Sequence, residues 1–132
     1  MPAPKRPRVL VVDDDDDIKK LIRFALSHLP LELDLLTASD GIEALALIQQ
    51  QPPDLVLLDV MMPRMDGFTV CQQLRANVRT AFLPIMMLTA NADEANRTKG
   101  YLVGTDDYVT KPFSVPDLHA RVMRMLRRTY GL

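Results

Sequence analysis

The 132-residue sequence has one cysteine, Cys71, and no apolar run long enough to cross a membrane. A single cysteine excludes an internal disulfide and favours a reducing, cytoplasmic location. A membrane-spanning helix needs about 18 consecutive apolar residues. The apolar segment at residues 9–12, which follows the basic start of the chain, is also too short for a signal peptide. We therefore expect neither a membrane span nor secretion through a signal peptide.

The sequence also lacks a large excess of charge of either sign. It contains 16 basic and 17 acidic residues, which give a formal net charge of -1. Surfaces that coat nucleic acid are strongly basic, so direct contact with nucleic acid is not expected. The 48% of hydrophobic residues is enough for one packed domain. We expect residues 1–7 to be a lead-in, residues 8–128 the domain, and residues 129–132 a tail or the start of a linker.

Short apolar segments alternate with helical patterns along the chain. The expected strands are residues 9–12, 32–38, 55–58, 85–88 and a short one near 108–109. The expected helices are about 18–29, 41–50, 67–76, 92–101 and 115–128. This alternation predicts an α/β fold, in which helices cover both faces of a parallel sheet. Right-handed crossovers favour a doubly wound sheet.

Polar residues stand where the expected strands end. Asp13 and Asp14 follow the first strand, Asp59 ends the third, Thr89 ends the fourth, and Lys111 follows the fifth. In open α/β sheets, ligands bind outside the carboxyl ends of the strands. We therefore expect these five side chains to converge on one small site.

The chemistry of these side chains indicates phosphoryl transfer with a metal ion. Clustered carboxylates raise one another's pKa values, and a bound divalent cation removes that repulsion. Hard oxygen ligands without nearby His or Cys favour Mg²⁺. A carboxylate can be a nucleophile toward a phosphoryl group, whose oxygens a Lys and a hydroxyl can stabilise. Asp15, Asp16 and Asp17 are expected only to cap the first helix and interact favourably with its dipole.

Four segments, in this order, resemble the receiver domain of two-component response regulators. They are VLVVDD at 9–14, DLVLLDVMMPRMDG at 54–67, PIMMLTA at 84–90 and GTDDYVTKPF at 104–113. The resemblance spans about residues 8–128. It implies a flavodoxin-like (βα)5 fold, a five-stranded parallel sheet with strand order 2-1-3-4-5.

The resemblance also implies the acceptor and the metal ligands. Asp59 is the phospho-acceptor in this reading. Mg²⁺ is the implied cofactor, bound by Asp13, Asp14, Asp59 and the backbone carbonyl of Met61. Asn91, two residues beyond the fourth strand, and Met61, two beyond the acceptor, stand at positions that tune dephosphorylation in the family.

Further roles follow from the same resemblance. Lys111 pairs with the phosphoryl group, and the peptide bond from Lys111 to Pro112 is expected to be cis. Thr89 is the switch hydroxyl. Tyr108 is an aromatic switch that turns inward when Thr89 moves toward the phosphoryl group. The catalytic set implied in this way is Asp59, Lys111 and Thr89.

The implied function is that of a phospho-accepting signalling domain and not of a conventional enzyme. The donor is the phosphohistidine of a sensor histidine kinase or of a phosphotransfer protein, and the domain itself catalyses transfer and later hydrolysis. Phosphorylation switches the surface made by residues 92–101, 108–109 and 115–128, which then controls a partner or an attached output domain. That surface suggests a two-fold homodimer with intermolecular salt bridges, or else a solvated charged face. The charged residues concerned are Arg97, Asp107, Asp117 and Arg121.

Three other functions fit parts of the sequence. A Mg²⁺-dependent phosphohydrolase of the haloacid dehalogenase type would use the DxD at Asp13–Asp15, but that family places its nucleophile after the first strand and needs further residues. A calcium-binding loop is excluded because Ile18 and Phe24 replace the Gly and Glu that it requires. A binding-only pseudo-receiver remains open, although the acceptor, acidic pair and lysine are all intact.

Overall fold

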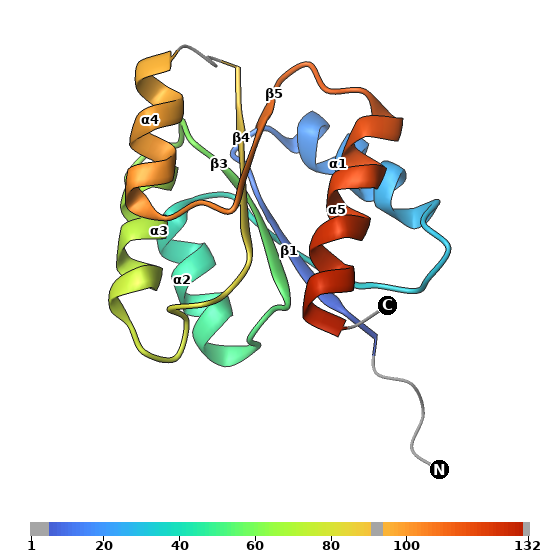
Figure 1. Cartoon of the computed structure of the whole chain (residues 1–132), viewed down its shortest axis with the longest axis horizontal. Coiled ribbons are helices and arrows are strands. Elements are labelled where there is room, and N and C mark those ends of the chain that lie inside the picture. The colour runs from blue at the N-terminus through green and yellow to red at the C-terminus, as the bar shows by residue number, and fades with distance from the viewer. Residues whose placement is uncertain (1–5, 91–93, 131–132) are drawn as a thin grey trace.

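The computed structural model describes residues 6–90 and 94–130, whose arrangement Figure 1 shows. The strands are β1 (Arg8–Val12), β2 (Asp34–Ala38), β3 (Leu55–Asp59), β4 (Ile85–Thr89) and β5 (Asp107–Thr110). The helices are α1 (Asp16–Ser27), α2 (Gly41–Gln50), α3 (Gly67–Ala76), α4 (Glu94–Val103) and α5 (Val115–Tyr130). All neighbouring strands are parallel, in the order β2-β1-β3-β4-β5, so the expected fold class is confirmed.

The sheet separates two apolar cores. In β1, Val9 and Val11 face the core that contains α1 and α5, whereas Leu10 and Val12 face the core that contains α2 and α3. Figure 1 shows α1 and α5 on one side of the sheet and α2, α3 and α4 on the other. A strand covered on both faces has no solvent side. This is why β1, β3 and β4 are unbroken apolar runs in the sequence.

Aspartates begin three of the helices. The side chain of Asp15 accepts hydrogen bonds from the backbone N–H groups of Asp17 and Ile18, at 2.9 and 3.4 Å. Asp40 caps α2 and Asp66 caps α3 in the same manner. Asp15 therefore has the capping role expected for part of the aspartate run, and the next two aspartates lie in the first turn of α1, where their charge favours the helix dipole.

Several element boundaries differ from the expected ones. β2 begins at Asp34 and not at residue 32, because its partner strand begins at Arg8, which is paired with Asp34. α1 ends at Ser27, three residues before Pro30, so the proline does not itself end the helix. α4 continues two residues beyond 101, to Val103.

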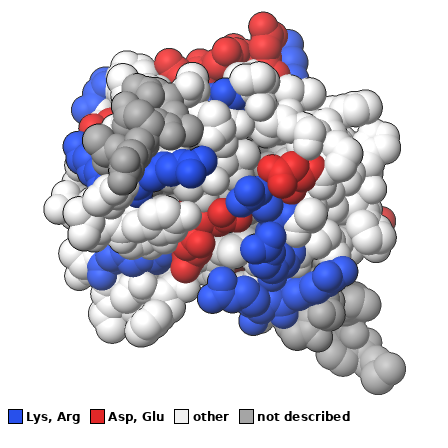
Figure 2. All heavy atoms as spheres, turned by 45° about the horizontal axis from the view of Figure 1, so that its top comes forward, with Lys and Arg blue, Asp and Glu red and all other residues white. Residues whose placement is uncertain are grey.

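The described residues contain no helix that is both long enough and apolar enough to cross a membrane. On the face that Figure 2 shows, acidic and basic side chains are interspersed. That mixture agrees with the formal net charge of -1.

Candidate functional site

The ends of β1 and β3 bring three carboxylates together. Asp13 is fully buried, Asp59 is 5% exposed, and Asp14 is exposed. One carboxylate oxygen from each residue lies within 4.8 Å of the other two. A hydrogen bond orients the side chain of Asp13, whose Oδ1 accepts the backbone N–H of Asp15 at 2.9 Å. The predicted convergence of the acidic residues is thus observed.

Lys111 enters the same cluster from the loop after β5. Its Nζ lies 2.7 Å from Oδ2 of Asp13 and 3.4 Å from Oδ1 of Asp59. Its backbone N–H donates to the carbonyl of Thr89 at 2.7 Å, which ties the loop to the end of β4. The peptide bond from Lys111 to Pro112 is cis, as the family resemblance implied.

The site is electrostatically unbalanced. Burial, and secondly the charge of Asp13, raise the pKa of Asp59 to about 6, although Lys111 and the Met61 N–H oppose the rise. Burial lowers the pKa of Lys111, but its hydrogen bond to Asp13 and the negative charges outweigh that effect and raise it. Three ionised carboxylates beside one ammonium group leave two negative charges uncompensated. Such a site attracts a cation.

Thr89 completes the group of residues expected at the strand ends. It is the last residue of β4 and is 1% exposed. The register pairs Asp59 of β3 with Leu88 of β4, so Thr89 lies one residue further toward the same edge of the sheet. All five side chains predicted from the sequence therefore lie at the carboxyl edge, in the loop after β1, at the ends of β3 and β4, and in the β5–α5 loop.

The family model described as the response regulator receiver domain matches residues 9–123. This chain belongs to that family. A curated relative, the DNA-binding dual master transcriptional regulator RpaA of Synechocystis, is 47% identical over 123 residues, which are 93% of this chain and 50% of RpaA. The receiver thus spans about half the length of the curated relatives that it matches.

Solved structures of receivers agree with the fold described above. A putative response regulator from Chloroflexus aurantiacus is 36% identical, with a TM-score of 0.88 over 94% of this chain and 100% of the other. The Mn²⁺-bound form of the response regulator Rcp1 is 25% identical, with a TM-score of 0.79 over 96% of each chain. Members of this family are therefore known with the same architecture and, in Rcp1, with a divalent cation.

The loop after Asp59 is held close to that residue. The N–H of Gly67 donates to the carbonyl of Val60 at 2.8 Å, and a Cβ on Gly67 would lie 2.3 Å from the carbonyl oxygen of Asp59. Only glycine allows this approach. The N–H of Met61 donates to Oδ1 of Asp59 at 3.4 Å, whereas the Met61 side chain is 71% exposed.

Sequence reasoning did not anticipate a contact between this loop and α2. Arg64 has a positive φ of 66° and donates a hydrogen bond to Asp40. The N–H of Glu43 and the Arg64 side chain both favour the ionised carboxylate, so the pKa of Asp40 is lowered. The only sequence signal was the turn-forming MPRMDG segment, which does not specify a partner 24 residues away.

The Tyr108 ring lies inside the receiver, on the α4 side of the sheet. It is 5% exposed, and a Cβ on Gly100 of α4 would be 3.0 Å from it. The ring of Tyr101 lies 6.5 Å away, centroid to centroid. The structure therefore has Tyr108 in the inward position that the sequence analysis associates with the phosphorylated form.

Three of the four charged residues considered for a dimer interface pair within this chain. Arg121 of α5 lies 2.7 Å from Asp107 and 3.0 Å from Asp117. Arg97 of α4 is exposed. If Arg121 formed a salt bridge across a dimer, it would have to give up its contacts with Asp107 and Asp117 of its own chain. Asn91 lies outside the described residues.

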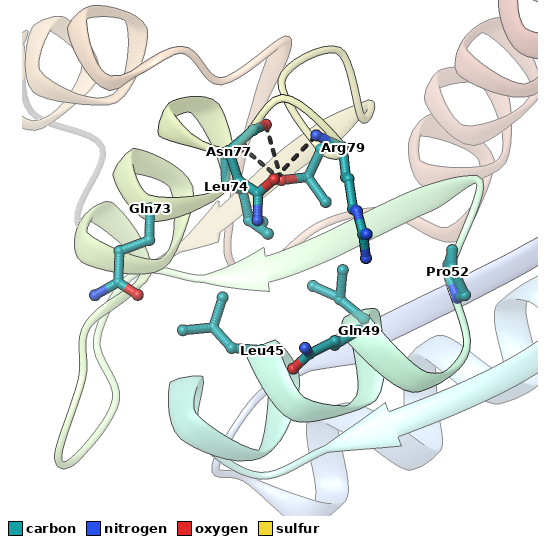
Figure 3. A pocket seen from close by; sticks show the side chains of 9 residues that line it. Leu45, Gln49, Pro52, Gln73, Leu74, Asn77 and Arg79 are labelled. Atoms are coloured by element: carbon teal, nitrogen blue, oxygen red, sulfur yellow. Dashed lines mark hydrogen bonds between the residues drawn. The ribbon is translucent and has the colours of Figure 1, made fainter.

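A groove on this receiver lies away from the acidic cluster. It lies between α2 and α3 and is lined by Leu45, Gln49, Gln73, Asn77 and Arg79 among others (Figure 3). None of the acidic residues of the cluster, nor Lys111, Thr89 or Tyr108, contributes to its lining. The acidic cluster is a small charged site of three carboxyl groups and one ammonium group, which suits an ion better than a large organic ligand.

Proposed function

We propose that this receiver accepts a phosphoryl group on Asp59. The donor is a phosphohistidine of a sensor histidine kinase or of a phosphotransfer protein. A carboxylate oxygen of Asp59 forms the new bond to phosphorus, while the phosphorus–nitrogen bond breaks and the imidazole leaves. The observation that carries the proposal is the buried carboxylate of Asp59 with an ammonium nitrogen 3.4 Å from it, at the end of a strand.

The residues around Asp59 suit each part of this transfer. The Lys111 ammonium is already held beside Asp59 by Asp13, so it can pair with the phosphoryl oxygens with little movement. The buried Thr89, one strand away, supplies a hydroxyl that can reach the transferred group. Hydrolysis of the aspartyl phosphate then returns Asp59 to its free form. The receiver is a signalling domain that promotes its own phosphorylation and dephosphorylation.

The donor set fits Mg²⁺. Oxygen ligands at close range, an excess of negative charge and a raised pKa of Asp59 describe a site that a hard divalent cation stabilises. Asp13, Asp14, Asp59 and the backbone carbonyl of Met61 would hold it. When bound, Mg²⁺ supplies positive charge to the phosphoryl oxygens. The Mn²⁺-bound form of Rcp1 supports this assignment.

Phosphorylation changes the surface formed by α4, β5 and α5. The new dianionic group gives Thr89 and Lys111 a new partner. When Thr89 moves toward that group, it leaves space that favours the inward position of the Tyr108 side chain on β5. The altered surface binds a downstream protein or output domain, or pairs with a second copy through Arg97, Asp107, Asp117 and Arg121. Sedimentation of the phosphorylated and unphosphorylated protein tests the pairing.

The same proposal bears on the location of the receiver and on its contact with nucleic acid. A cytoplasmic location fits a reducing environment and a kinase that presents phosphohistidine there. The expectation of no direct nucleic-acid contact concerns these 132 residues. RpaA, which is called a DNA-binding regulator, shares only 50% of its length with them.

The intact mass of the protein after incubation with acetyl phosphate tests the proposal. With Mg²⁺, the mass should increase by one phosphoryl group, and the increase should be absent in Asp59→Asn. Sustained release of phosphate from small phosphoesters would instead indicate a phosphohydrolase. No increase and no phosphate release, although Mg²⁺ binds, would indicate a binding-only pseudo-receiver.

A further inference from the structure

One arginine joins two loops at the end of the sheet opposite the acidic site. Arg75 lies in the last turn of α3, and its side chain is 19% exposed. Its guanidinium group donates to the carbonyls of Thr80, Ala81 and Leu83, with the shortest distance, 2.7 Å, to Leu83. These carbonyls belong to the loop between α3 and β4.

The same guanidinium group binds the loop between α4 and β5. Its Nε donates to the carbonyl of Gly104 at 2.9 Å, and its second terminal nitrogen pairs with Oδ2 of Asp106 at 2.9 Å. That carboxylate oxygen also accepts the backbone N–H of Ile85, the first residue of β4, at 2.9 Å. Arg75 thus connects the end of α3, the start of β4 and the approach to β5.

Gly104 is the joint between α4 and β5. Its φ is +102°, and its N–H donates to the carbonyls of Gly100 and Tyr101, which ends α4. A Cβ at this position would lie 3.0 Å from the Arg75 side chain. Glycine is therefore required here both by the backbone conformation and by the close arginine.

The α3–β4 loop is also held by hydrogen bonds of its own. The Thr80 hydroxyl donates to the carbonyl of Leu74 at 2.6 Å, and the side chain of Asn77 accepts the backbone N–H of Arg79 at 3.0 Å. Figure 3 shows these bonds at the end of α3, beside the groove. Arg75 therefore holds the α4–β5 joint against a loop that is itself well ordered by hydrogen bonds.

α4 is otherwise lightly packed. Tyr101 and Leu102 are 55% and 81% exposed, and Val103 is only partly buried against the core. Lys99 contacts the ring of Phe68 of α3 at 4.7 Å. Elements with few buried contacts move at low free-energy cost. The hydrogen bonds around Gly104, together with the one from the Cys71 thiol to the Val103 carbonyl at 3.3 Å, therefore hold the carboxyl end of α4.

We propose that Arg75 is a positioning residue for switching: it fixes the joint at Gly104, so that α4 moves about its own carboxyl end when the receiver is phosphorylated. This inference rests on the proposed phosphorylation of Asp59. If the carboxyl end of α4 is fixed, a movement of the amino-terminal end of α4 near the acidic cluster rotates the whole helix. Tyr108, which packs against Gly100 and Tyr101 of α4, must then repack. Without the fixed joint, α4 fluctuates in both states, and phosphorylation changes its position less.

Amide hydrogen exchange of the whole chain tests the role of Arg75, before and after treatment with acetyl phosphate and Mg²⁺. We compare the unsubstituted protein with Arg75→Gln and with a control, Arg79→Gln. Arg79 is exposed on the same loop, and the structure pairs its backbone but not its guanidinium with Asn77. Arg75→Lys is the second variant, because a lysine keeps the charge beside Asp106 but cannot donate to both loops.

Without phosphodonor, Arg75→Gln should exchange about tenfold faster at residues 77–84 and 100–107, with β1 and β3 unchanged. It should still gain one phosphoryl group. The change in α4 exchange on phosphorylation should shrink at least about threefold, and Arg79→Gln should behave like the unsubstituted protein. Arg75→Lys should give the same pattern more weakly, and it decides the matter if Arg75→Gln does not fold.

Two results overturn the inference. An undiminished change in α4 exchange on phosphorylation would show that the joint does not direct switching. A uniform increase of exchange over all strands would show that Arg75 only stabilises the fold. Failure of the unsubstituted protein to gain a phosphoryl group would refute the proposed function instead, and the exchange without phosphodonor would still report whether Arg75 fixes the joint.

Discussion

The ammonium nitrogen of Lys111 lies 2.7 Å from Oδ2 of Asp13, although the two residues are 98 positions apart in the sequence. Asp13 is fully buried and the Lys111 side chain is 16% exposed, so water screens the pair weakly. The contact also holds the ammonium group 3.4 Å from Asp59. Lys111 therefore neutralises part of the negative charge of the carboxylates and holds a positive charge beside Asp59.

Loss of the Lys111 ammonium should destabilise the metal-free protein. In Lys111→Gln the buried charge of Asp13 loses its partner, so the free energy of unfolding at neutral pH should fall by about 2–4 kcal/mol. Urea denaturation measures this change. Lys20→Gln removes an exposed lysine of α1 and should change stability by less than about 0.5 kcal/mol. Equal effects of the two substitutions would show that the pair with Asp13 contributes nothing.

The raised pKa of Asp59 predicts a pH dependence of stability. The folded state holds the proton of Asp59 up to about pH 6, whereas the unfolded chain releases it near about pH 4. Between these values the folded state binds more protons, so stability falls as pH rises. Without Mg²⁺, this carboxylate should cost about 1–3 kcal/mol at neutral pH.

Urea denaturation of the native protein and Asp59→Asn, at about pH 4.5 and about pH 7.5, isolates this contribution. The variant should be the more stable of the two at the higher pH, and the part of the difference that comes from the raised pKa should shrink to about a third at the lower pH. Saturating Mg²⁺ should remove the disadvantage of the native protein. A difference independent of pH would mean that Asp59 has an ordinary pKa in the folded chain.

Binding of Mg²⁺ should depend on the acidic pair and not on the rest of the aspartate run. Asp13→Asn and Asp14→Asn should each weaken Mg²⁺ binding about tenfold or more, because each removes a carboxylate from the cluster. Asp16→Asn, in the exposed first turn of α1, is the control and should bind like the native protein. Calorimetric titration measures the affinities. Equal weakening by all three would indicate diffuse attraction by the run and no defined site.

The close approach of Gly67 to the end of β3 should be sensitive to one added methyl group. In Gly67→Ala the new Cβ must move away from the Asp59 carbonyl, 2.3 Å distant, so stability should fall by about 1–3 kcal/mol. Phosphoryl uptake should slow as well, because the backbone of Asp59 shifts. Gln72→Ala, on the exposed side of α3, should change neither. Unchanged uptake in Gly67→Ala would show that this approach does not position the acceptor.

The alternation of strands and helices and the ends of the strands could be predicted from the sequence. Buried parallel strands are continuous apolar runs, and polar residues such as Asp59 and Thr89 mark where they end. The strand order could not be derived from periodicity and came from the family resemblance. The start of β2 and the end of α1 were misplaced. The first is determined by the pairing with β1 and the second by the local turn after Ser27, neither of which composition specifies.

Outside the acidic site, several interactions that join distant segments could not be predicted. The contact of Arg64 with Asp40 depends on a residue with positive φ, and that of Arg75 depends on two loops meeting beside Gly104. For Arg121 the sequence left open a salt bridge across a dimer or a solvated charged face, and did not indicate its pairing with Asp107 of the same chain. In each case the charge was visible in the sequence, but its partner is determined by tertiary packing.

Chemical trapping of the acceptor tests the central claim most directly. After incubation with acetyl phosphate and Mg²⁺, borohydride reduction converts an aspartyl phosphate into homoserine, which fragmentation of the tryptic peptide 24–64 locates. We expect homoserine at residue 59 and nowhere else in that peptide, which also contains Asp34, Asp40 and Asp54. Homoserine at another aspartate, or none in a protein that has gained phosphoryl mass, would contradict the assignment of Asp59 as the acceptor.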